Sequence, residues 1–170
     1  MIHNIRYRVF VYEHEDLDLI TQALLNILPN AEIEAEEVEG LLEEPMVILS
    51  GIISKKRHTK EFLNNLLAID KEQLTKLHND LDKKMDEKGN LFLRFSKDFK
   101  PSEDLNNDSE DNDKDLNLTE DDKDLKQDLS QWKILDGGDS IHLKVKVAAY
   151  PAKKEVALKK LEEVFSNLGK

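Results

Sequence analysis

Cationic and aromatic residues alternate with aliphatic residues in three stretches of the chain. In Ile5–Tyr12, Leu91–Ser96 and Ile141–Val147, apolar side chains recur at every second position, which is the period of a half-buried β-strand. Cationic groups can neutralise phosphates, and aromatic rings can stack on unpaired bases. The outer positions of these strands are therefore candidate contacts to a nucleic acid: Arg6, Arg8, Arg94, His142, Lys144 and Lys146 for phosphates, and Phe10, Tyr12 and Phe92 for stacking.

Two further basic patches precede expected helices. Lys55, Lys56 and Arg57 form a basic turn, and Lys153 and Lys154 open the last helical segment. Either patch could grip a phosphate backbone, and either could equally be a solvated helix start. The outer strand residues also have a second interpretation, because lysine and arginine are common on the wet face of antiparallel sheets. The absence of acids from those outer positions, in a chain with 36 acidic and 25 basic residues, favours the nucleic-acid interpretation.

Motifs for catalysis or metal binding are missing from the sequence. There is no cysteine, and the five histidines have no metal-ligand spacing. Asp111–Asp122 has the acidic alternation of a calcium loop, but Leu116 occupies the position that requires glycine. We therefore predict no catalytic residue, no metal site and no cofactor. An enzyme of unknown type would need a pocket with a carboxylate and a histidine of shifted pKa, which no sequence feature predicts.

The formal charge of −11 is unevenly distributed along the chain. Ala31–Glu44 holds seven acids and no base, and Lys97–Ser130 holds 13 acids and five lysines, which leaves the remainder mildly basic. Lys97–Ser130 has too little apolar surface to offset the entropy of ordering, so we predict a disordered acidic insertion over residues 97–130. No apolar run reaches the ~20 residues of a membrane span, and no signal peptide is evident, so a cytoplasmic protein without membrane contact is expected.

The order of periodic segments predicts the fold class. Helical spacing over residues 17–28, 62–67, 74–85 and 157–168 alternates with strands, in the order strand-helix-strand-strand-helix-helix-strand-strand-helix. Ala31–Glu39 is expected at a sheet edge because of its charge, and Met46–Ile53 as a central strand covered on both faces. We predict one α+β domain, residues 1–170, with a mainly antiparallel sheet of about five strands and helices packed on one face.

Three segments of the sequence resemble a known family. IHNIRYRVFVYEHED, KGNLFLRFSK and GDSIHLKVKVAAYPAKKE are similar to small archaeal RNA-binding proteins described as predicted exosome subunits. The resemblance implies a fold similar to the ribosomal protein that binds 5S rRNA, and RNA binding without catalysis. Related chains have a much shorter connection in place of residues 97–130. The positions that match the family's motifs are Arg6, Arg8, Arg94, His142, Lys144, Lys153 and Lys154.

Together these features predict a non-enzymatic RNA-binding protein of low sequence specificity, with exosome- or ribosome-related proteins as further partners. The alternative is a protein-interaction adaptor in an RNA-processing complex, which docks a basic partner through the acidic insertion or the acidic edge strand.

Overall fold

A computed structural model of the chain describes residues 1–101 and 127–167. Within these ranges five strands form an open antiparallel sheet in the order β2-β3-β1-β5-β4. The strands are β1 (Ile2–Tyr12), β2 (Glu34–Glu39), β3 (Pro45–Ile53), β4 (Asn90–Phe95) and β5 (Ile141–Val147). The helices are α1 (Leu17–Ile27), α2 (Lys56–Leu66), α3 (Lys71–Asp80) and α5 (Lys154–Ser166), with a 3-10 turn, η3, at Leu129–Gln131. The predicted α+β class and element order are confirmed, and β2 is an edge strand as expected.

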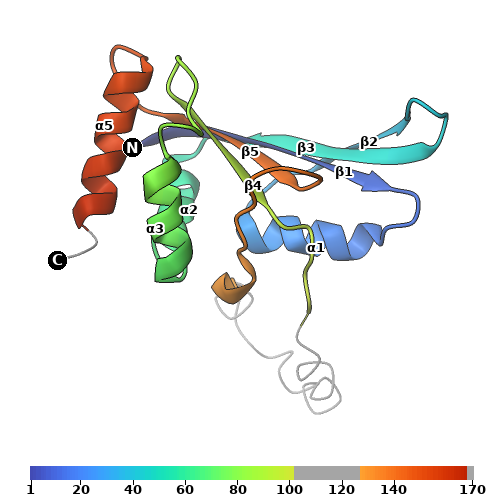
Figure 1. Ribbon diagram of the computed structural model, residues 1–170. Helices are drawn as coiled ribbons and strands as arrows, with labels where there is room; N and C mark the ends of the chain where they lie inside the picture. The colour runs from blue at the N-terminus through green and yellow to red at the C-terminus, as the bar shows by residue number, and fades with distance from the viewer. Residues whose placement is uncertain (102–126, 168–170) are drawn as a thin grey trace.

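The two faces of the sheet differ in what covers them. α1, α2 and α3 lie against one face, and α5 stands beside α3 at one end, with the Phe165 ring 5.4 Å from that of His78 (Figure 1). Along β1, the side chains of Ile5 and Val9 face the helices and are fully buried, whereas Arg6 is exposed on the opposite face. We call these the inner and outer faces. The described helices thus cover the inner face alone, as predicted.

The register of the strands arranges the outer side chains in rows across the sheet. Residues directly opposite each other in antiparallel strands project to the same face. The first row, from β3 to β4, is Ile52, Arg6, Lys144 and Phe92. The second row, from β2 to β4, is Glu34, Ser50, Arg8, His142 and Arg94. Residues separated by up to about 140 positions in the sequence therefore become neighbours.

The expectation that both faces of Met46–Ile53 are covered is wrong. Leu49 and Ile53 point inward and are buried, but Ile52 points outward and is 44% exposed. Apolar residues on both sides of a strand predict two covering layers. Here the described helices supply one layer, so the outward isoleucine lies on the surface among cations.

Both ends of the segment predicted as an insertion contact the folded body. The Lys100 amide donates to Gln131 Oε1 at 2.6 Å, and Gln131 Nε2 donates to the Lys100 carbonyl at 2.8 Å. Asn26 of α1 exchanges hydrogen bonds of 3.0 and 2.8 Å with the backbone of Asp128. Residues 102–126, which include the calcium-loop-like Asp111–Asp122, lie outside the described residues, so disorder there stays a prediction.

Gly51 makes room for a link between β1 and the chain that enters β2. Tyr7 is buried opposite Gly51, and its hydroxyl donates to the Glu32 carbonyl across β3. A Cβ atom at Gly51 would lie 2.3 Å from Tyr7 Oη and 2.5 Å from the Glu32 carbonyl oxygen. Any side chain at position 51 must therefore displace this link.

Gly51→Ala should lower the free energy of unfolding by about 1–3 kcal/mol, because the added methyl group overpacks a closed site. Gly137→Ala is the matched control, since an added Cβ there meets nothing within 4 Å. Its effect should stay within about 0.5 kcal/mol. Urea denaturation of both variants measures the difference, and equal effects would contradict the steric argument.

Candidate nucleic-acid interface

The middle of the outer face is concave. A depression of about 630 Å³ lies over the first and second rows and is bordered by residues from all five strands. Its lining includes six of the predicted contacts: Arg6, Arg8, Phe92, Arg94, His142 and Lys144. The lining residues that were not predicted as contacts include Glu34, Ser50 and Ile52, which belong to the same outward rows.

Four cations of the depression form no ion pair among the described residues. Within residues 1–101 and 127–167, Arg6, Arg8, Arg94 and Lys144 have no carboxylate oxygen within 4.0 Å of their charged nitrogens. Side chains directly opposite on adjacent strands are separated by only ~5 Å at their Cβ atoms. Like charges so close together create a positive local potential, which attracts an anionic ligand.

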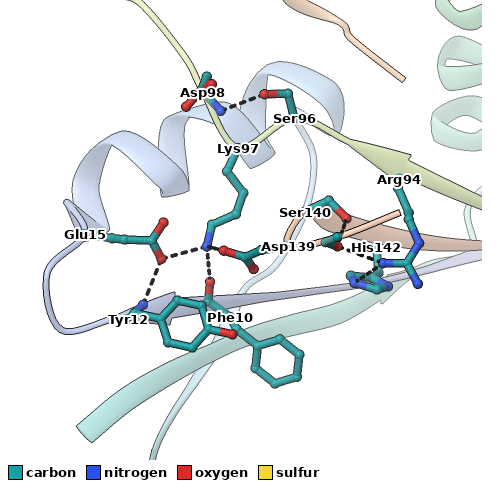
Figure 2. Close-up of polar contacts among 11 residues, drawn as sticks. Phe10, Tyr12, Glu15, Arg94, Ser96, Lys97, Asp98, Asp139, Ser140 and His142 are labelled. Atoms are coloured by element: carbon teal, nitrogen blue, oxygen red, sulfur yellow. Dashed lines mark hydrogen bonds and ion pairs between the residues drawn. The ribbon is translucent and has the colours of Figure 1, made fainter. Parts of the chain in front are cut away.

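His142 orients Arg94. The Arg94 Nη1 atom lies 3.0 Å from His142 Nε2 and donates a 3.0 Å hydrogen bond to the Gly138 carbonyl (Figure 2). Burial lowers the pKa of His142, and the charges of Arg94 and Arg8 lower it further, whereas Asp139 opposes them. A lowered pKa favours the neutral ring at pH 7, and in a neutral ring Nε2 can accept from Arg94, which only donates. At this pH His142 fixes a guanidinium in place and adds no charge of its own.

The three predicted stacking residues have different surroundings. Phe92 lines the depression and is 43% exposed, so its ring is open to a ligand. Phe10 and Tyr12 are half-buried and lie further along β1. The Arg8 guanidinium lies 5.3 Å from the Phe10 ring centroid, and Lys97 Nζ lies 5.0 Å from that of Tyr12. The structure thus brings one of the three rings into the depression.

The remaining predicted cations lie outside the depression. Lys146 is exposed on the outer side of β5, one outer position beyond Lys144. Lys55, Lys56 and Arg57 are exposed where β3 leads into α2. Lys153 is exposed before α5, and Lys154 pairs with Asp82 at 3.1 Å. These residues could contact a longer ligand that extends past the central rows.

Lys97, which falls in the predicted insertion, connects three strand ends. Its Nζ lies 2.6 Å from Glu15 Oε1, 2.7 Å from Asp139 Oδ2 and 2.7 Å from the Phe10 carbonyl oxygen (Figure 2). The side chain is only 7% exposed. Composition could not identify this residue, because it stands at the start of a strongly acidic stretch. Its contacts tie the ends of β1 and β4 to the loop before β5.

Lys97→Met should lower the free energy of unfolding by roughly 1–3 kcal/mol. This is less than for a fully buried pair, because Asp139 is 42% exposed. Lys100→Met, at an exposed lysine nearby, is the control and should change stability by less than about 0.5 kcal/mol. Chemical denaturation at pH 7 compares the two variants.

The two variants should also differ in how their stability depends on pH. Burial alone would raise the pKa of Glu15, but hydrogen bonds from Lys97 and the Tyr12 amide hold it below its usual value of 4.5. A carboxyl group with a depressed pKa stabilises the fold above its unfolded pKa, and this contribution is lost as pH falls below about 4.5. Lys97→Met should flatten that acid-side loss, and an unchanged slope would contradict the assignment.

Arg94→Met should raise the pKa of His142 toward its usual value of 6.5, because it removes the larger of the two positive charges' effects that disfavour a protonated ring. An NMR titration of the His142 ring protons measures the shift. Lys159→Gln, an exposed charge change on α5, should leave the His142 pKa as it is in the unaltered protein. No upward shift in Arg94→Met would show that Arg94 does not influence the ring.

Two kinds of feature are absent from the described part of the chain, metal-binding clusters and membrane-spanning helices. Within it, no group of three or more His, Cys, Asp or Glu side chains is arranged to hold a metal ion. None of its helices combines the length and apolarity needed to cross a membrane.

Comparison with known proteins places the chain in a family. A family model described as RNA binding matches residues 4–113. The RNA-binding protein PAB1135 of Pyrococcus abyssi is 29% identical over 168 residues, which cover 95% of this chain and 92% of that protein. The structure of Mth689, a DUF54 protein from Methanothermobacter thermautotrophicus, is 33% identical with a TM-score of 0.69, over 97% and 98% of the two chains. The protein AF2318 from Archaeoglobus fulgidus shares the fold, with 24% identity, a TM-score of 0.68, and 96% and 99% of the two chains covered. The family model spans well over half of this chain, which therefore belongs to the RNA-binding family.

Proposed function

We propose that this protein binds RNA through its outer sheet face and does not catalyse a reaction. One observation carries the proposal: cations from β1, β4 and β5 surround a single depression and lack ion-pair partners among the described residues. In this proposal Arg6, Arg8, Arg94 and Lys144 contact phosphates, and the open Phe92 ring stacks on a base. The family's RNA-binding character supports RNA as the ligand, and the choice of face rests on the cations alone.

Contacts beyond the depression extend the proposed footprint. Lys146 continues the cationic outer side of β5, and the basic turn Lys55–Arg57 lies at the same end of the sheet, because β3 and β5 both end there. Lys153 and Lys154 contribute less, since Lys154 is already paired with Asp82. Backbone contacts of this kind position an RNA without reading its sequence.

The cellular setting is a further part of the proposal. We place the protein in the cytoplasm, with RNA that an exosome- or ribosome-related assembly handles. The support is the resemblance of the opening and closing sequence motifs to archaeal proteins described as predicted exosome subunits. The proposed likeness to the ribosomal protein that binds 5S rRNA has the same support.

The alternative is an adaptor that docks a basic protein segment on β2. Among the described residues β2 pairs only with β3, and it carries four glutamates in six residues. The opposite sheet edge is covered, since Phe92 donates to the Lys84 carbonyl and Leu135 donates to the Arg94 carbonyl. An open acidic edge suits an added basic strand, although charge on an edge strand also serves simply to prevent pairing.

The RNA proposal predicts that removing a cation of the depression lowers the affinity for RNA and makes that affinity less dependent on salt. Lys144→Gln and Arg6→Gln should each weaken binding to a single-stranded oligonucleotide. Each should also reduce the slope of log K against log salt by about 0.7, the value for one phosphate contact. Filter binding at several salt concentrations measures both quantities. Lys159→Gln on α5 is the matched charge control, and Arg57→Gln tests the basic turn.

Equal effects of Lys144→Gln and Lys159→Gln would contradict the assignment of the depression. Absence of RNA binding at low salt, in the full chain and in a variant lacking residues 102–126, would contradict RNA binding altogether. The adaptor would then be supported if the full chain binds a basic protein partner and if reversing the charges along β2 abolishes that binding.

A further inference from the structure

The depression contains one carboxylate that a phosphate site does not need. Glu34 lies at the β2 end of the second row, opposite Ser50, and is the single acidic residue among the described residues that line the depression. A carboxylate repels phosphate and can only accept hydrogen bonds. A ligand group that lies beside Glu34 must therefore be a hydrogen-bond donor, and RNA offers two kinds of donor, the ribose 2′-hydroxyls and the nucleobase edges.

The ends of the first row are apolar and the middle is cationic. Ile52 is 44% exposed and Phe92 is 43% exposed, and Arg6 and Lys144 stand between them. Three strand spacings separate the two apolar side chains, a distance of about 14 Å. Bases against the two ends, with phosphates over the centre, would match this order. In a duplex the base faces are stacked and the Watson–Crick edges are paired, so only an unpaired strand can present both.

Glu34 and Arg8 enclose a space suited to a purine. They lie in the same row two strand spacings apart, which is about 10 Å. The Watson–Crick edge of guanine carries two adjacent donors, N1–H and the exocyclic amine, which match the two oxygens of a carboxylate. Its opposite edge carries O6 and N7, the acceptors that arginine most often contacts. A guanine in this space would take Arg8 for its base edge and leave Arg6, Arg94 and Lys144 for phosphates. On the other three bases an acceptor stands next to each Watson–Crick donor, so a carboxylate contact there is less favourable.

Building on the proposed function, we infer that the RNA is single-stranded and crosses the strands, with one base against Phe92 and a guanine at the Ile52 end read by Glu34. This adds a single base preference to binding that is otherwise directed at phosphates. The carboxylate supplies the discrimination, and the cations supply most of the affinity.

Fluorescence anisotropy with labelled hexauridine and its single-substitution variants tests the inference on the full chain. An oligonucleotide with one central guanosine should bind about tenfold more tightly than those with adenosine or cytidine, as expected for one bidentate base contact. Inosine keeps N1–H but lacks the exocyclic amine, so it should lose most of that advantage. Glu34→Gln should reduce the preference to within about twofold, because an amide offers one acceptor instead of two.

Glu36→Gln is the matched control. Glu36 lies on the same strand and the same face, opposite Ile48, and does not line the depression, so the guanosine preference should persist in that variant. Equal binding of all hexamers, a preference that survives Glu34→Gln, or tighter binding of a duplex than of the single strand would overturn the inference and leave RNA binding standing. Failure of every oligonucleotide to bind at low salt would instead overturn the proposed function as well.

Discussion

The pairing of β1 with its two neighbours fixes which side chains face outward. Strand side chains alternate, so a slip of one residue would exchange the two faces of β1. Such a slip would bury Arg6 and Arg8 beneath the sheet and expose Ile5. Burial of an unpaired guanidinium is strongly unfavourable, and exposure of the buried aliphatic residues loses their hydrophobic contribution. The register shift between β1 and β5 is confined to the beginning of β1, between Ile2 and Asn4, so the rows across the centre of the sheet stay aligned. Core packing thereby determines the electrostatics of the opposite face.

The crowded cations on that face must be tolerated by the rest of the fold. Their mutual repulsion disfavours the folded state, and no described carboxylate within 4.0 Å relieves it at Arg6, Arg8, Arg94 or Lys144. Two other features limit the cost. A neutral His142 accepts a hydrogen bond from Arg94, and Lys97 joins the strand ends at the margin of the same face.

Local periodicity predicted the fold because the alternation of side chains within each strand shows which of them face the core and which face outward. The alternation of Ile141, Leu143 and Val145 with His142 and Lys144 needs no partner to be recognised, so the outer residues of β1, β4 and β5 were identified correctly. The neighbours of those residues could not be identified in this way. Strand order and register bring Ile52 opposite Arg6 and place Glu34 in the same row as Arg8, and neither strand order nor register can be recognised from a short stretch of sequence.

Composition failed at the ends of the acidic segment for a related reason. Averaging over residues 97–130 concealed Lys97, which is nearly buried. Two residues past that segment, Trp132 is fully buried, with the rings of Phe62 and Phe95 at 5.7 and 5.5 Å. These contacts join segments that are remote in sequence.

The net charge of −11 is misleading in the same manner, since it sums over charged groups that no ligand encounters together. At physiological salt the Debye length is ~8 Å, so a phosphate in the depression responds chiefly to the cations that line it. The acids outside act on RNA that approaches elsewhere, and their repulsion there reduces non-specific adsorption. An acidic protein with a confined basic surface therefore favours RNA that reaches this surface over RNA held by diffuse attraction.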